Sequence, residues 1–368
     1  MKRVNSLYIH IPFCTHLCEY CDFTKMFYLR PFVNKYIKFL VKEIDDLKNQ
    51  KFKTIYIGGG TPSSLSAYNL KLILASLNKH LKKGSEFTIE VNVENLTLEK
   101  LHLFKEYGIN RISIGVQTFN DELLKSINRH HTARQVKYWI KQIKKMGFNN
   151  INIDLIYGLP NQTLELFKND LKEAISLDIN HISSYSLTVS KGTMFYNRGI
   201  KEVDEDTSRM YYDTLYNYLT KHGFKRYEVS NFAKNKAYSK HNLTYWNDEN
   251  YIGLGLGAHG YVNNIRYQNT TNINDYLKGN TVQYQEELSN NNILEEFLML
   301  NLRKYNGFLI SEFNKRFGDI KSHKLYKTIK ELEQEKMLKI TKYRVYPTYE
   351  GMMLLDAILL RLFMGEEK

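Results

Sequence analysis

Residues 7–23 read LYIHIPFCTHLCEYCDF, a short apolar strand pattern that runs directly into Cys14, Cys18 and Cys21, which are all the cysteines of this 368-residue chain. Three clustered cysteines exclude a disulfide scaffold and favour a reducing compartment with metal or cluster ligation. A 4Fe–4S cluster held by three cysteines keeps one iron open to a small molecule. The spacing leaves two alternatives: a zinc site completed by His10 or His16, and unused thiols.

Outward from this stretch, short β-rich runs alternate with amphipathic helical patterns. Thr97, Thr132 and Thr163 stand where helix N-caps are expected, and Gly108 and Gly147 stand where the first two of these helices would end. The predicted strands are 7–11, 54–57, 87–91, 111–115, 151–157 and 181–187. Six βα units predict a parallel α/β fold, but periodicity alone leaves open a partial barrel or a doubly wound sheet.

The pattern changes after about residue 225. Residues 231–290 are polar, aromatic and rich in glycine, which predicts an irregular connecting segment. GLGAHG, residues 255–260, matches a dinucleotide fingerprint only formally, and we interpret it as a loop near the ligand pocket. Residues 291–368 predict helices and a hairpin in a winged-helix-like α+β domain, so the expected division is 1–230, 231–290 and 291–368.

The formal charge of +13 is dispersed, so it favours a solvated basic surface over a nucleic-acid interface. No secretory signal is evident at the start of the chain. The apolar residues 351–363 are interrupted by Asp356 and Arg361 and are too short to span a membrane. These features predict a cytoplasmic protein without a membrane span.

A second motif decides the family resemblance. Residues 55–65, IYIGGGTPSSL, are a strand that runs into three glycines, which allow close approach of a ligand to the backbone. Together with the C-x3-C-x2-C spacing, with Tyr20 before the last cysteine, this loop resembles the radical S-adenosylmethionine (SAM) superfamily. The resemblance implies a partial (β/α)6 TIM-like barrel, a 4Fe–4S cluster and SAM.

The resemblance extends over nearly the whole chain, through IEVNVENLT, SIGVQTF, INRHHTA, NIDLIYGLP and LRKYNGF. It points to the branch that contains coproporphyrinogen III dehydrogenase and the HemW family of haem chaperones. The dehydrogenase has a further cysteine where this chain has Phe23, and it has a long N-terminal arm, whereas this chain starts seven residues before Tyr8. HNLTYW, residues 241–246, matches the haem-binding HNxxYW pattern of HemW.

By resemblance, the cysteines ligate the cluster and a second set of residues lines the SAM region: Tyr8, Gly59, Gly60, Thr61, Glu90, Gln117, Arg129 and Asp154. Glu90 suits a ribose or ammonium group, and Arg129 suits the methionine carboxylate. His241 is the expected axial ligand of haem, with Tyr245 and Trp246 stacking on the porphyrin.

The resemblance therefore implies a haem chaperone that binds a 4Fe–4S cluster, SAM and haem and delivers haem to a client protein. An electron donor such as flavodoxin or ferredoxin is an expected partner, nucleic acid is not, and a homodimer is the default oligomer. The alternative is an enzyme, the oxygen-independent coproporphyrinogen III dehydrogenase, which decarboxylates propionate side chains by radical chemistry.

Overall fold

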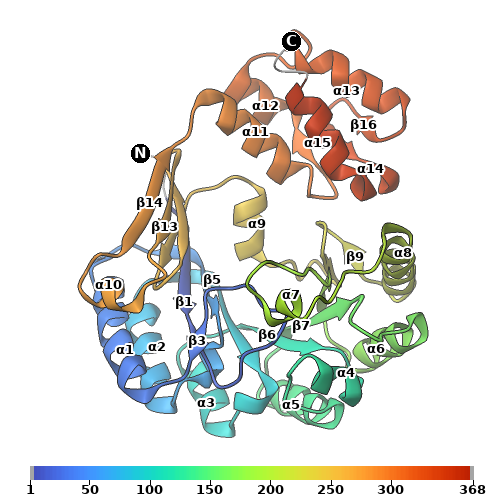
Figure 1. Ribbon diagram of the computed structural model, residues 1–368. Helices are drawn as coiled ribbons and strands as arrows, with labels where there is room; N and C mark the ends of the chain where they lie inside the picture. Colours follow the sequence, from blue (N-terminus) through green and yellow to red (C-terminus); the bar gives the residue numbers. More distant parts are fainter. Residues whose placement is uncertain (1–3, 365–368) are drawn as a thin grey trace.

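A computed structural model describes residues 4–364, and six parallel strands form the centre of its largest sheet (Figure 1). They pair in chain order: β1 (Ser6–Ile11), β4 (Phe52–Gly59), β5 (Leu81–Asn92), β6 (Arg111–Gln117), β7 (Asn150–Tyr157) and β8 (His181–Ser186). A doubly wound sheet requires a reversal of strand order, and these six strands have none. The fold is therefore the partial barrel, and β11 pairs in parallel with the free side of β1.

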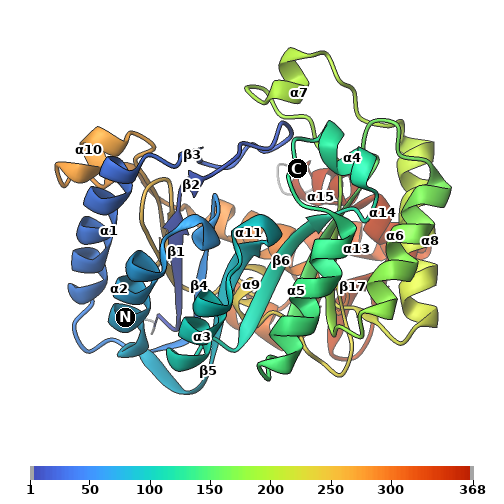
Figure 2. The ribbon, with the colours of Figure 1, turned by 90° about the horizontal axis from the view of Figure 1, so that it is seen from below.

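One helix or more follows each of these strands, and most of these helices cover the outside of the barrel, whereas α7 (Met194–Asn197) projects away from that layer and contacts Glu19 (Figure 2). These helices are α1 (Arg30–Asp45), α2 (Ala67–Asn78), α3 (Leu98–Glu106), α4 (Asp121–Ser126), α5 (Ala133–Lys145), α6 (Leu164–Ser176), α7 (Met194–Asn197) and α8 (Glu205–Lys221). The three capping threonines are confirmed, because each hydroxyl accepts a hydrogen bond from the backbone N–H three residues later.

The two faces of the parallel strands differ in polarity. Ile112 and Ile114 of β6 are buried against the helices, whereas Arg111, Ser113 and Gly115, which alternate with them, line the barrel interior. Successive side chains of a strand point to opposite faces, so the β6 sequence has an apolar outside and a polar inside. The other strands repeat this arrangement, and the barrel interior carries polar groups that can face a ligand.

Residues 231–290 are not an irregular connector, so that expectation is wrong. They add β10 (Asn231–Ala233), with its neighbour β9 (Lys225–Arg226), at the β8 edge and β11 (Tyr251–Leu254), β12 (His259–Val262), β13 (Ile265–Asn269) and β14 (Val282–Glu287) beyond β1. The remaining elements are α9 (Lys240–Trp246) and α10 (Ile273–Leu277). The strands β12 and β13 are joined by a turn at Asn263 and Asn264, which both have positive φ. The strands of this region are short, so the alternation of polar and apolar residues along each of them is hard to recognise in the sequence.

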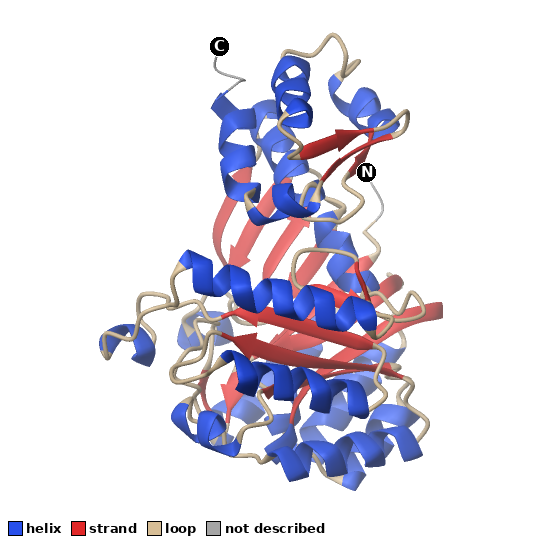
Figure 3. Cartoon of the chain, turned by 90° about the vertical axis from the view of Figure 1, so that its right-hand side faces the viewer, coloured by secondary structure: helices blue, strands red, loops and turns tan. Residues whose placement is uncertain are grey.

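The C-terminal residues form a smaller unit above the barrel with its own apolar core (Figure 3). Its elements are α11 (Asn290–Asn301), β15 (Phe308–Leu309), α12 (Ile310–Phe317), α13 (Leu325–Gln334), β16 (Leu338–Ile340), β17 (Arg344–Pro347), α14 (Tyr349–Met353) and α15 (Leu355–Met364). Three strands pair in the order β15-β17-β16. Among the helices of residues 4–364, none has the length and apolar character needed to cross a bilayer.

Candidate functional site

A cavity of about 440 Å³ lies inside the barrel and opens where the parallel strands end. Cys14, Cys18 and Cys21 all line it. So do seven residues of the expected SAM set: Gly59, Gly60, Thr61, Glu90, Gln117, Arg129 and Asp154. Ligand sites of parallel barrels form at this carboxyl edge because the loops after the strands converge there.

The cysteine loop begins at β2 (Phe13–Cys14) and ends at β3 (Met26–Phe27), which pair in parallel at the cavity mouth. Cys14 is buried, and Cys18 and Cys21 are half-buried. Burial raises the pKa of the Cys14 thiol to about 11, and burial also raises the pKa of Cys21. Both thiols are therefore protonated without a metal, and iron binding would release their protons.

The three glycines of the GGGTP loop each occupy a place where a side chain would collide. A Cβ on Gly58 would lie 3.0 Å from the Glu90 carboxyl, and one on Gly59 would lie 2.7 Å from the His10 ring. A Cβ on Gly60 would lie 2.8 Å from the Pro12 carbonyl and 3.0 Å from Cys14 Sγ. The glycines therefore let the loop lie close against Pro12 and Cys14, and the Thr61 hydroxyl of the same loop bonds Cys14 Sγ at 3.4 Å.

The residues fit a cluster better than a zinc ion completed by histidine. His10 Nε2 donates to the Thr24 carbonyl at 2.8 Å, while Nδ1 bonds the Tyr8 hydroxyl at 2.9 Å. The His16 ring is stacked on His130 with 3.8 Å between the ring centroids. Within the described part of the chain, no three His, Cys, Asp or Glu side chains are grouped to hold one metal ion.

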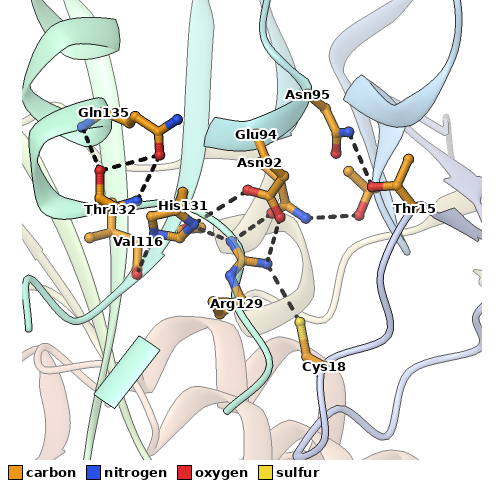
Figure 4. Close-up of polar contacts among 12 residues, drawn as sticks. Thr15, Cys18, Asn92, Glu94, Asn95, Val116, Arg129, His131, Thr132 and Gln135 are labelled. Atoms are coloured by element: carbon orange, nitrogen blue, oxygen red, sulfur yellow. Dashed lines mark hydrogen bonds and ion pairs between the residues drawn. The ribbon is translucent and has the colours of Figure 1, made fainter. Parts of the chain in front are cut away.

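Arg129 connects the cysteine loop to the barrel wall (Figure 4). Its guanidinium donates to Cys18 Sγ at 3.5 Å, to Asn92 Oδ1 at 3.0 Å and to the Gly115 carbonyl at 2.5 Å. Glu94 Oε1 lies 4.0 Å from the same guanidinium nitrogen that donates to Cys18. Burial alone would raise the pKa of Glu94, but the hydrogen bond from His131 and the charge of Arg129 lower it to about 2.

Two further carboxyl groups lie inside the cavity. Glu90 accepts from the Tyr56 hydroxyl at 2.6 Å and from the Gly59 N–H at 3.2 Å. Burial raises its pKa to about 7. Burial also raises the pKa of Asp154, which accepts from Asn152 Nδ2 at 2.8 Å. Paired carboxyls of this kind suit a cationic or hydroxyl-bearing ligand.

Gln117 and Tyr8 complete the expected SAM set. Gln117 has a φ of 71° at a register shift between β6 and β7, and this strained bulge turns the residue toward the cavity. Tyr8 does not line the cavity, because it lies behind the wall, stacked on Tyr56 with 6.2 Å between ring centroids.

Comparisons with known proteins agree with this geometry. The sequence profile of the radical SAM superfamily matches residues 8–174, and that of the HemN C-terminal domain matches residues 288–354. The haem chaperone HemW of Lactococcus lactis is 41% identical over 361 residues, 95% of each chain. HemW of Bacillus subtilis is 38% identical over 380 residues, 99% of this chain and 100% of the relative. The chain belongs to the HemW family.

The chain also has the same fold as an enzyme whose structure is solved. Coproporphyrinogen III oxidase (HemN) from Escherichia coli, a radical SAM enzyme, has a TM-score of 0.86. The match covers 98% of this chain and 90% of that chain at 22% sequence identity. At that identity the likeness shows the partial barrel and the C-terminal unit, and nothing about activity.

The stretch that resembles the HemW haem motif forms α9, at the end of the barrel away from the cysteines. His241 is fully buried there. Its Nδ1 bonds Thr54 Oγ1 at 2.9 Å and its Nε2 bonds the Tyr245 hydroxyl at 2.7 Å. Burial and the charge of Arg111 lower the pKa of His241 to about 3, so the ring is neutral. Trp246 is half-buried at the helix end, and neither it nor Tyr245 lines the cavity.

Sequence reasoning missed several residues that line the cavity or support its wall. Arg111, Ser113 and Asn152 line the cavity, and Glu94 with His131 supports Arg129. A signal was present, because RISIG and INID alternate polar and apolar residues with the period of a strand. The alternation identifies which side chains face the barrel interior once the strands are placed.

Proposed function

We propose that this protein is a haem chaperone of the HemW type, which binds a 4Fe–4S cluster, SAM and haem and delivers haem to a client protein. The observation that carries the proposal is the full-length similarity to chaperones of that name, joined to one cavity that collects all three cysteines and the GGGTP loop. The geometry of the cavity in this chain supports the same assignment.

In this proposal Cys14, Cys18 and Cys21 hold the cluster, and the bound cluster supplies an open iron and one electron for SAM. Arg129 donates one hydrogen bond to Cys18 Sγ and holds the cysteine loop against the barrel. Glu90 and Asp154 offer carboxyl groups to the hydroxyl and cationic groups of SAM. Gly59, Gly60 and Thr61 of the glycine loop line the same cavity as the cysteines, where SAM would bind.

Haem binding requires a change at α9. Iron binds an imidazole nitrogen that has a free electron pair, and both nitrogens of His241 are occupied by Thr54 and Tyr245. We infer that Tyr245 releases Nε2 when haem binds. The client protein and a one-electron donor such as flavodoxin or ferredoxin remain the expected partners.

An anaerobic haem titration of the cluster-loaded protein tests the proposal. We expect a saturable Soret shift that His241→Ala abolishes. His102→Ala, a change at an exposed histidine of α3, is the matched control and should titrate like the parent. Coproporphyrinogen III, offered with SAM and a reductant, should give no decarboxylated product. Product formation without a haem shift would favour the dehydrogenase alternative instead.

A further inference from the structure

Arg111 lies at the floor of the cavity, at the opposite end from the cysteines. It is the first residue of β6, and its side chain is 2% exposed. It lines the cavity together with Ser113, Asn152 and Asn242. Asn242 belongs to α9, so the cavity extends from the cysteine loop to the helix that carries the HNxxYW pattern.

No protein group in the described part of the chain hydrogen-bonds this guanidinium, although its charge acts on the nearby Glu90 and Asp154 carboxyls. Within residues 4–364, the Arg111 side chain forms no hydrogen bond or ion pair, and its buried Nε has no partner. The two nearby carboxyls are held by other groups, Glu90 by Tyr56 and Asp154 by Asn152. Arg129, the other arginine of the cavity, shows the contrast, since it makes three hydrogen bonds.

Two histidines near Arg111 carry no negative charge. His181 bonds Asn152 through Nδ1 at 2.5 Å and Tyr227 through Nε2 at 2.7 Å. Burial and the charge of Arg111 lower the pKa of both His181 and His241, so both rings are neutral. A buried guanidinium without hydrogen bonds is unfavourable, and a ligand that accepts hydrogen bonds at this end of the cavity would complete it.

We propose that Arg111 is the binding residue for a ligand carboxylate at the floor of this cavity. The planar guanidinium matches a carboxylate through two parallel hydrogen bonds, and the open space of the cavity reaches it. Two sources supply this chemistry: a propionate side chain of haem, which the position beside α9 favours, and the methionine carboxylate of SAM, which the family resemblance places at Arg129 instead. The inference depends on the proposed function in one respect, because SAM and haem are the ligands that the proposed function names.

Paired ligands with and without the carboxylate test the inference. The binding constants of SAM and decarboxylated SAM, and of haem and haem dimethyl ester, are measured for the parent and Arg111→Gln. For one of the two pairs, we expect Arg111→Gln to lower the affinity of the ligand that carries the carboxylate about tenfold or more. The affinity of its carboxylate-free partner should not change. The affected pair identifies the source. Arg134→Gln, on the exposed side of α5, removes the same charge and should change neither pair.

The Tm of the ligand-free protein gives a second readout. If Arg111 had a structural role, its replacement would lower this Tm, whereas the loss of a ligand-binding residue would not. Arg111→Met removes a buried charge that no hydrogen bond compensates and leaves Glu90 and Asp154 free to stay protonated, so the ligand-free Tm should stay equal or rise. A Tm lowered by many degrees, or a variant that does not fold, would show Arg111 to be a structural counterion and would overturn the inference. So would equal binding of both pairs by the parent and Arg111→Gln.

These outcomes separate the inference from the proposed function. If the parent binds SAM and haem and Arg111→Gln binds them equally well, only the carboxylate site is wrong. If the parent binds neither ligand, the proposed function and the site fail together.

Discussion

Glu90 and Asp154 bring two carboxyl groups into the interior of a parallel barrel, a place that branched apolar side chains usually fill. Such groups need hydrogen-bond partners, and each has a donor within 2.8 Å. Their raised pKa values show that these donors do not fully replace water. A cationic ligand would complete the solvation that the protein leaves unfinished.

The ionisation of Glu90 gives a pH prediction for SAM binding. Burial raises its pKa to about 7, with Asp154 adding to the rise and Tyr56, Gly59 and Arg111 opposing it. SAM carries a sulfonium cation, so its affinity should rise up to about tenfold between pH 6 and 8, as Glu90 ionises. Glu90→Gln should flatten this profile in a titration followed by calorimetry.

The same pKa predicts the sign of a stability effect. A carboxyl whose folded pKa lies above its unfolded value favours folding below the unfolded value, and this contribution is lost as the pH rises through about 7. Without ligand, Glu90→Gln should therefore gain stability over the parent at pH 8. An equal or lower Tm at that pH would contradict the burial of an ionisable Glu90.

Gly60 gives a steric prediction at the same scale. A Cβ there would lie 2.8 Å from the Pro12 backbone and 3.0 Å from Cys14 Sγ, so Gly60→Ala should displace the first cysteine and lower the bound iron severalfold. Gly84→Ala is the control, since its Cβ meets nothing within 4 Å and only its φ of 77° is strained. That control should lose about 1 kcal/mol of stability and keep its iron.

At the scale of elements, α9 is held at the barrel end by contacts from three strands. The Glu86 carboxylate of β5 accepts from the N–H groups of Lys240 and His241 at 3.0 and 2.9 Å. Ser6 of β1 bonds Thr244 at 2.8 Å, and Thr54 of β4 bonds His241. These contacts fix the helix, so freeing His241 is a local change at the Tyr245 hydroxyl.

Tyr245→Phe tests that local change. The variant keeps an aromatic ring and removes the hydroxyl that occupies His241 Nε2 at 2.7 Å. One hydrogen bond is worth about 1 kcal/mol net, so haem should bind about fivefold more tightly in a Soret titration. Tyr238→Phe, at a ring that packs on Tyr227, is the matched control and should leave the affinity unchanged. Weaker haem binding by Tyr245→Phe would show that the hydroxyl contributes to the haem site.

Some of these elements could be predicted from the sequence, and others could not. The strands and the threonine caps could be predicted because each depends on local patterns, a run of apolar residues or one hydroxyl before a helix. The strands of residues 231–290 could not, because β11 is placed by its parallel pairing with β1, more than two hundred residues away. The unpartnered state of Arg111 depends on several strands at once and is equally invisible in the sequence.

At the scale of the molecule, a buried arginine joins the barrel to the C-terminal unit. Arg226 is 4% exposed and donates to the Tyr212 hydroxyl at 2.5 Å. Its guanidinium lies 5.2–5.8 Å from four tyrosine ring centroids. Two of these rings, Tyr212 and Tyr216, belong to α8, whereas Tyr305 and Tyr349 belong to the C-terminal unit.

Arg226→Ala should therefore weaken the junction between the two units. The lost hydrogen bond and cation–π contacts predict a loss of about 3 kcal/mol of unfolding free energy in urea. Arg209→Ala removes the partly exposed pair with Glu350 at the same junction and should cost about 1 kcal/mol or less. Equal losses for the two variants would contradict the role given to the buried arginine.

We propose above that the three cysteines at the cavity mouth hold a cluster with one iron open to SAM. Anaerobic reconstitution, followed by iron and sulfide analysis and by EPR of the reduced protein with and without SAM, tests it most directly. We expect about four irons and four sulfides per chain and an EPR spectrum that SAM changes. A single zinc without sulfide, or a cluster spectrum that SAM leaves unchanged, would contradict it.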